Sequence, residues 1–136
     1  KLKEISYIHA EAYAAGELKH CTLALVVQDT PVIALATQPA LWAKTMSNVE
    51  EVRARGGYVY LFTPSDPGAP AAAEPAATAS QPAFAGLDGV LLPPVDPWLA
   101  PVVAVVSMQL LAYWAAVARG CDVDRPRNLA KSVTVE

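Results

Sequence analysis

The sequence predicts an α/β fold, a three-layer sandwich in which a small, mainly parallel sheet is flanked by helices. Three segments predict this class: a strand, helix and strand pattern over residues 31–62, a short apolar run at residues 87–95, and a long apolar segment over residues 98–118. A strand, a helix and a second strand fit in about thirty residues, which is the size of one βαβ unit. Such units build parallel sheets whose faces are covered by helices.

The opening segment pairs a carboxylate with an amine. Lys1, Glu4, Ile8 and Glu11 follow one another at helical spacing. A helix here would place Lys1 and Glu4 on one face. One interpretation is a solvated ion pair that contributes a few tenths of a kcal/mol. The other is a carboxylate that transfers protons beside an amine.

A second short helix is expected after Gly16, which ends the first one. It begins at Glu17, continues through Leu25, and carries His20, one of the 2 histidines in the chain. A single histidine is more often structural than catalytic, although an imidazole that titrates near neutral pH can also transfer protons.

The central segment supplies two strands and the helix between them. Residues 31–37 form a continuous apolar run, as in a buried parallel strand, and residues 58–62 form a second strand. Between them, apolar side chains recur at helical spacing from Leu41 to Val52. The expected boundaries of this helix are Thr37 as its cap, Pro39 in its first turn, and Gly56 and Gly57 at its end.

The second half begins with an Ala- and Pro-rich stretch at residues 64–86, which we expect to form a surface loop. Residues 98–118 are long and apolar enough to span a bilayer. A helix that covers a parallel sheet and a dimer surface is also apolar on most sides, so we expect no membrane association. Tyr113 and Trp114 are expected in the core or in an interface.

Composition limits the classes of partner. The chain has 10 basic and 13 acidic residues, a net charge of -3, and no basic patch, so nucleic acid is not an expected partner. Cys21 and Cys121 lie in no metal or redox spacing, which indicates reduced thiols in a cytosolic protein. The sequence contains neither a GxGxxG nor a P-loop, and we expect no nucleotide, metal or other cofactor.

The closing segment follows Gly120, which is expected to end the long helix. Residues 121–136 have no helical or strand period and contain several turn-forming residues. Lys131 lies in this tail. A lysine there is usually solvated and inert, whereas a catalytic lysine needs a pocket that lowers its pKa.

Three blocks of the chain, in this order, resemble the C-terminal half of the isomerase domain of the glutamine:fructose-6-phosphate amidotransferases, also called glucosamine-6-phosphate synthases. The blocks are KEISYIHAEAYAAGELKH at residues 3–20, SNVEEVRARGG at residues 47–57 and QLLAYWAAVARGCDVDRPRNLAKSVTVE at residues 109–136. The resemblance implies that residues 1–136 are the second of two tandem sugar-isomerase (SIS) subdomains. Within it, residues 64–86 would be a surface loop, and residues 121–136 a catalytic tail that becomes ordered on binding.

The resemblance also implies four site residues. Lys131 matches the lysine that forms an imine with the C2 carbonyl of fructose-6-phosphate. Glu4 matches the carboxylate that moves a proton between C1 and C2. His20 matches the histidine that helps to open the furanose ring, and Lys1 matches a lysine that assists nearby proton transfers. The implied overall reaction converts fructose-6-phosphate and ammonia from glutamine to glucosamine-6-phosphate.

One departure lies beside a site residue. The family continues GELKHGP, whereas Cys21 and Thr22 follow His20 here. Glycine permits positive φ and proline fixes φ, so their replacement changes the backbone conformations that are allowed after His20. The direction in which His20 points is therefore open.

The chain begins inside a charged, helix-like segment, so we expect a fragment of a larger enzyme that is inactive alone. The resemblance implies a missing first SIS subdomain, a missing glutaminase domain and a cytoplasmic homodimer in which His20 acts on the neighbouring subunit. Two alternatives remain. One is an SIS sugar-phosphate deaminase or deglycase, and the other is a non-catalytic SIS module that binds a sugar phosphate or only dimerises.

Overall fold

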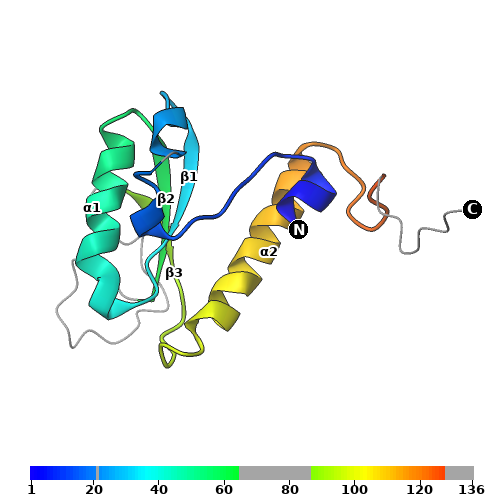
Figure 1. Ribbon diagram of the computed structural model, residues 1–136. Coiled ribbons are helices and arrows are strands. Elements are labelled where there is room, and N and C mark those ends of the chain that lie inside the picture. The colour runs from blue at the N-terminus through cyan, green and yellow to red at the C-terminus, as the bar shows by residue number, and fades with distance from the viewer. Residues whose placement is uncertain (21, 65–86, 128–136) are drawn as a thin grey trace, which may run out of the picture. The chain divides into compact units, whose positions relative to one another are not determined.

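The computed structural model describes residues 1–20, 22–64 and 87–127. The chain divides into two compact units, one of Lys1–Ala12 with Val105–Glu136 and the other of Tyr13–Ala104. The second unit contains the sheet and the helix that packs on it (Figure 1). Residues 65–86 of the predicted surface loop, together with residues 128–136 and therefore Lys131, lie outside the described residues.

The sheet has three parallel strands in the order β1-β2-β3 (Figure 1). They are β1 (Pro31–Leu35), β2 (Tyr58–Thr63) and β3 (Asp88–Leu91). The register pairs Val32 with Val59 and Phe62 with Val90. The strands are rich in the β-branched and aromatic residues that suit a pleated surface. The prediction of a small parallel sheet is confirmed.

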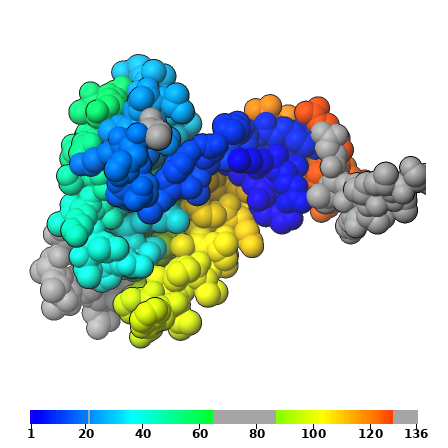
Figure 2. All heavy atoms as spheres, viewed as in Figure 1, coloured from blue at the N-terminus to red at the C-terminus, as the bar shows by residue number. Residues whose placement is uncertain are grey.

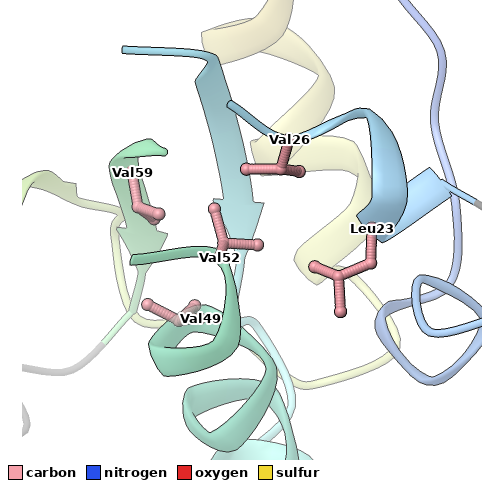
Figure 3. Close-up of a cluster of buried hydrophobic side chains, with 5 residues drawn as sticks. All are labelled: Leu23, Val26, Val49, Val52 and Val59. Atoms are coloured by element: carbon pink, nitrogen blue, oxygen red, sulfur yellow. The ribbon is translucent and has the colours of Figure 1, made fainter. Parts of the chain in front are cut away.

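Helix α1 (Trp42–Arg53) connects β1 to β2 and packs on one face of the sheet. Its Val49 and Val52 belong to a cluster of five buried side chains, drawn in Figure 3. The cluster consists of Leu23, Val26, Val49, Val52 and Val59. Each such side chain contributes about 1.5–3 kcal/mol when fully buried, so this cluster is the main support of the unit.

Strand β1 is parallel as predicted, but the prediction that it is buried is wrong. Val32 and Ala34 pack against the core cluster, whereas Ile33 and Leu35 are 38% and 44% exposed. Alternate side chains of a strand point to opposite faces of the sheet. Within the unit, therefore, α1 covers the face of β1 that carries Val32 and Ala34.

The start of α1 differs from the prediction in its capping. A 3-10 turn at Pro39–Leu41 precedes the helix, and Gln38 and Leu41 occupy the two capping positions. Neither cap makes a side-chain hydrogen bond, so the prediction that Thr37 caps the helix is wrong. Pro39 opens the turn because its fixed φ suits a helical start.

Helix α2 (Ala100–Ala118) confirms the predicted long apolar helix, and Gly120 follows its end with φ +67°. By length and composition, α2 could cross a membrane. It is the one such helix in the described part of the chain. A stretch of 18 of its residues has a mean hydropathy of 1.7, and 22% of that stretch is buried. The buried positions are small alanines: Ala100, Ala104, Ala112 and Ala116.

The large side chains of α2 lie on its surface. Leu110 is 55% exposed and Trp114 63% exposed, while Tyr113, whose ring centroid lies 5.2 Å from that of Trp114, is 42% exposed. The prediction that Tyr113 and Trp114 lie in the core of their unit is therefore wrong. The alternative, that they lie in an interface with another protein surface, remains a prediction. Atoms from the start of α2 are visible in yellow on the face shown in Figure 2. Trp98, which precedes the helix, is 91% exposed.

Candidate functional site

The opening segment forms one turn and not the longer helix that the sequence spacing predicts. The turn spans Leu2–Ser6 and has π-helical geometry. Ser6 is fully buried, and its hydroxyl donates a 2.7 Å hydrogen bond to the carbonyl oxygen of Leu2. Tyr7 then takes a left-handed backbone conformation, φ 58° and ψ 22°. This conformation ends the helical path, so the prediction of a helix through Glu11 is wrong.

Lys1 and Glu4 lie together on this turn, as predicted. Lys1 Nζ is 2.9 Å from Glu4 Oε2, and the Glu4 side chain is 31% exposed. The hydrogen bond from Lys1, reinforced by its positive charge, lowers the pKa of Glu4. Glu4 is therefore ionised at neutral pH, the state that a base must have before it accepts a proton.

Tyr7 makes a contact that sequence analysis missed. The backbone N–H of Arg127 donates a 2.7 Å hydrogen bond to the Tyr7 hydroxyl, across 120 residues of sequence. The Arg127 guanidinium lies 4.2 Å from the centroid of the Tyr7 ring, within the range of a cation–π contact. No local pattern in the sequence signals such a pairing.

The segment between α2 and Arg127 has its own local structure. Asp122 Oδ1 accepts hydrogen bonds from the backbone N–H groups of Asp124 and Arg125, each at 3.0 Å. This arrangement is an Asx turn, in which an aspartate side chain replaces a backbone acceptor. The chain that leads to Lys131 is thus fixed at Asp122 and again at Arg127.

His20 lies in the other unit. Two 3-10 turns, Ala15–Glu17 and Thr22–Leu25, replace the single short helix predicted there, and Gly16 lies inside the first turn. The His20 side chain is 73% exposed, and its Nε2 is 3.8 Å from Glu17 Oε2. Of the four predicted site residues, the structure thus brings together Lys1 and Glu4.

An open hollow of about 640 Å³ lies at the carboxyl end of β1, in the same unit as His20. The polar residues that line it include Thr37, Lys44, Thr45 and Ser47. Lys19 also lines it, with its amine 2.5 Å from Glu51 Oε1. In the described residues, no group of three or more His, Cys, Asp and Glu side chains is placed to hold a metal ion.

An open parallel sheet with a hollow beyond one strand end defines a class of α/β domain that binds its ligands at the carboxyl ends of strands. Comparison with protein families narrows this class. Residues 1–119 match the SIS domain model, and the chain belongs to the SIS domain family.

Curated relatives match the whole chain. It is 55% identical over 141 residues to "Glutamine--fructose-6-phosphate aminotransferase [isomerizing]" of Caldanaerobacter subterraneus subsp. tengcongensis and 54% identical over 137 residues to the protein of that name from Thermus thermophilus. It is 52% identical over 139 residues to the protein of that name from Escherichia coli. Each match covers 100% of this chain and 20% of the relative, so the chain spans a fifth of their length.

A solved structure agrees with this assignment. The chain matches the "C-terminal domain of glucosamine-fructose-6-phosphate aminotransferase from Francisella tularensis" with a TM-score of 0.72 and 42% sequence identity. The match covers 90% of this chain and 31% of that one. The SIS fold and the resemblance to the C-terminal part of these aminotransferases are thereby confirmed.

Proposed function

We propose that this chain is the second SIS subdomain of a glutamine:fructose-6-phosphate aminotransferase (isomerizing). The whole enzyme would convert fructose-6-phosphate and ammonia from glutamine to glucosamine-6-phosphate. The observation that carries the proposal is identity above half over the entire chain to proteins of that name. Residues 64–86 would form a surface loop, and residues 121–136 a catalytic tail.

The proposed chemistry begins at Lys131. Its amine would attack the C2 carbonyl of fructose-6-phosphate and release water to form an imine. The imine withdraws electrons and makes the neighbouring C–H acidic, so that a carboxylate can remove the proton. Glu4 suits this step because the hydrogen bond from Lys1 lowers the pKa of Glu4 and keeps it ionised. His20 would help to open the sugar ring.

The exposed surface of α2 supports the proposal that this chain packs against other parts of a larger enzyme. Large apolar side chains of α2, such as Val102 and Leu110, are 62% and 55% exposed. An apolar surface of this kind suits burial against another part of the enzyme. We propose the first SIS subdomain, the glutaminase domain and a second copy of the enzyme as partners, and a cytoplasmic location without membrane or nucleic acid.

The test is a chimera in which this chain replaces the matching fifth of the Thermus thermophilus relative. We expect it to form glucosamine-6-phosphate from fructose-6-phosphate and glutamine. Glu4→Gln should abolish isomerisation and leave imine formation intact, because the base acts after the imine forms. Lys3→Gln is the matched control, since Lys3 lies on the same turn and is exposed. A chimera that assembles like its parent and forms no product would contradict the proposal.

One observation favours a second candidate, a non-catalytic SIS module. Cys21 and Thr22 stand where the family has glycine and proline. A chimera with Cys21→Gly and Thr22→Pro distinguishes the two candidates. If only this variant forms product, the natural chain is the non-catalytic module. If both form product at similar rates, the departure has no functional consequence.

A further inference from the structure

We propose that Tyr7 is a positioning residue, which holds the start of the C-terminal tail beside the turn that carries Lys1 and Glu4. This inference rests on the proposed function for the roles of Glu4 and Lys131. The contact between Tyr7 and Arg127 stands independently of those roles, since both residues belong to one compact unit.

The first support is the backbone of Tyr7. A bulky side chain rarely adopts the left-handed conformation, and such residues persist where the surrounding structure holds them. Tyr7 has φ 58° and directly follows the fully buried Ser6, whose hydrogen bond to Leu2 closes the turn. The phenol of Tyr7 is therefore presented from a fixed base, three residues after Glu4.

The second support is that two different groups of Arg127 meet Tyr7. The backbone N–H of Arg127 binds the hydroxyl at 2.7 Å, and its guanidinium lies 4.2 Å from the ring centroid. The Asx turn at Asp122 shapes the chain up to Arg125, two residues before this contact. The tail is thus anchored at Arg127, although this residue is itself exposed.

The third support is the length of chain beyond the anchor. Lys131 follows Arg127 by four residues, and a chain spans at most about 3.5 Å per residue, or about 14 Å in total. The contact with Tyr7 therefore limits how far from the turn of Glu4 the chain that carries Lys131 can extend. Imine formation and proton transfer act on adjacent carbons of one sugar, so both groups must reach the same substrate.

The test uses the full-length chimera and three variants. Tyr7→Phe removes the hydroxyl acceptor and keeps the ring. Arg127→Met removes the cation and keeps the backbone N–H, so the two contacts are separated. Tyr60→Phe is the control, because it deletes a phenol hydroxyl on β2, in the other unit. The readouts are hydrogen exchange at the Arg127 amide, the rate of the reducible Lys131 adduct with fructose-6-phosphate, and kcat and KM separately.

We expect Tyr7→Phe to speed exchange at Arg127 at least about fivefold and to slow adduct formation about tenfold, because a displacement near 1 Å can cost up to a hundredfold in rate. KM should stay within about twofold and the thermal midpoint should equal that of Tyr60→Phe, which a merely structural role would not produce. The exchange rate and the adduct rate of Arg127→Met should fall between those of Tyr7→Phe and those of the control.

Equal adduct rates in wild type and Tyr7→Phe would overturn the inference and leave the proposed function intact. Slower adduct formation that is matched by a lower thermal midpoint would also overturn it, since Tyr7 would then act through stability. If the wild-type chimera forms no adduct, the proposed function fails and the positioning role falls with it.

Discussion

Gly57→Ala tests whether α1 and β2 pack as closely as the structure places them. A Cβ at Gly57 would lie 2.6 Å from Val52 Cγ1 and 3.0 Å from Val26 Cγ1. Ordinary carbon contacts are about 3.5–4.0 Å, so these side chains would have to move by up to about 1 Å. Both valines belong to the buried core cluster, at 1% and 9% exposure, which leaves them little room to move.

The expected cost is that of overpacking a core, about 1–3 kcal/mol of unfolding free energy. For a domain of this size, that loss lowers the thermal midpoint by about 3–5 °C per kcal/mol. The backbone adds no penalty, because among the described glycines the left-handed ones are Gly56 and Gly120. The measurement is urea unfolding of the variant beside the wild-type chain.

Gly16→Ala is the matched control, since an added Cβ there would have nothing within 4 Å. Its unfolding free energy should change by less than about 1 kcal/mol and can even rise, because alanine reduces the entropy of the unfolded chain. If Gly57→Ala is as stable as Gly16→Ala, the close approach of β2 to Val52 and Val26 is wrong.

Three further predictions concern single groups. Gly120 has φ +67° and open space around it, so Gly120→Ala should cost about 1–2 kcal/mol in urea unfolding and Gly120→Asn less. Lys1 lowers the pKa of Glu4, so Glu4 should titrate by NMR below its ordinary range, and Lys1→Met should raise that pKa. The stabilisation of the fold by ionised Glu4 is present above the unfolded-state pKa and is lost as the pH falls through the folded-state pKa. Tyr58 donates a 2.5 Å hydrogen bond to Asp88, and this bond raises the pKa of the Tyr58 phenol. The stabilisation from this bond should be lost as the pH rises through the folded-state pKa, and Asp88→Asn should lower the pKa of Tyr58 in a spectrophotometric titration.

The sequence predicts best those elements whose side chains have a clear period. The strand, α1 and second strand were predicted nearly to their ends because an apolar run and a helical repeat each bury one face. The prediction of a longer opening helix is wrong because the apolar and charged spacing fits a helix, whereas the backbone of Tyr7 leaves the right-handed helical conformation. The prediction that β1 is buried is wrong because a continuous apolar run does not show how many faces of the strand are covered.

The candidate site shows a similar division. The pairing of Lys1 with Glu4 follows from local spacing, since it needs only one helical turn. The contact between Tyr7 and Arg127 joins residues 120 apart in the sequence, and only the folded chain brings them together. The role of Lys131 comes from family resemblance alone, because no period or spacing in the tail points to it.

The most direct measurement of the central claim is a borohydride trap on the chimera. The protein is incubated with fructose-6-phosphate, reduced, digested and analysed by mass spectrometry. An imine at Lys131 would be reduced to a stable secondary amine that carries the sugar phosphate. The account predicts this adduct on the Lys131 peptide and none on Lys19 or Lys44, the two lysines that line the hollow. An assembled chimera without an adduct at Lys131 would contradict the account.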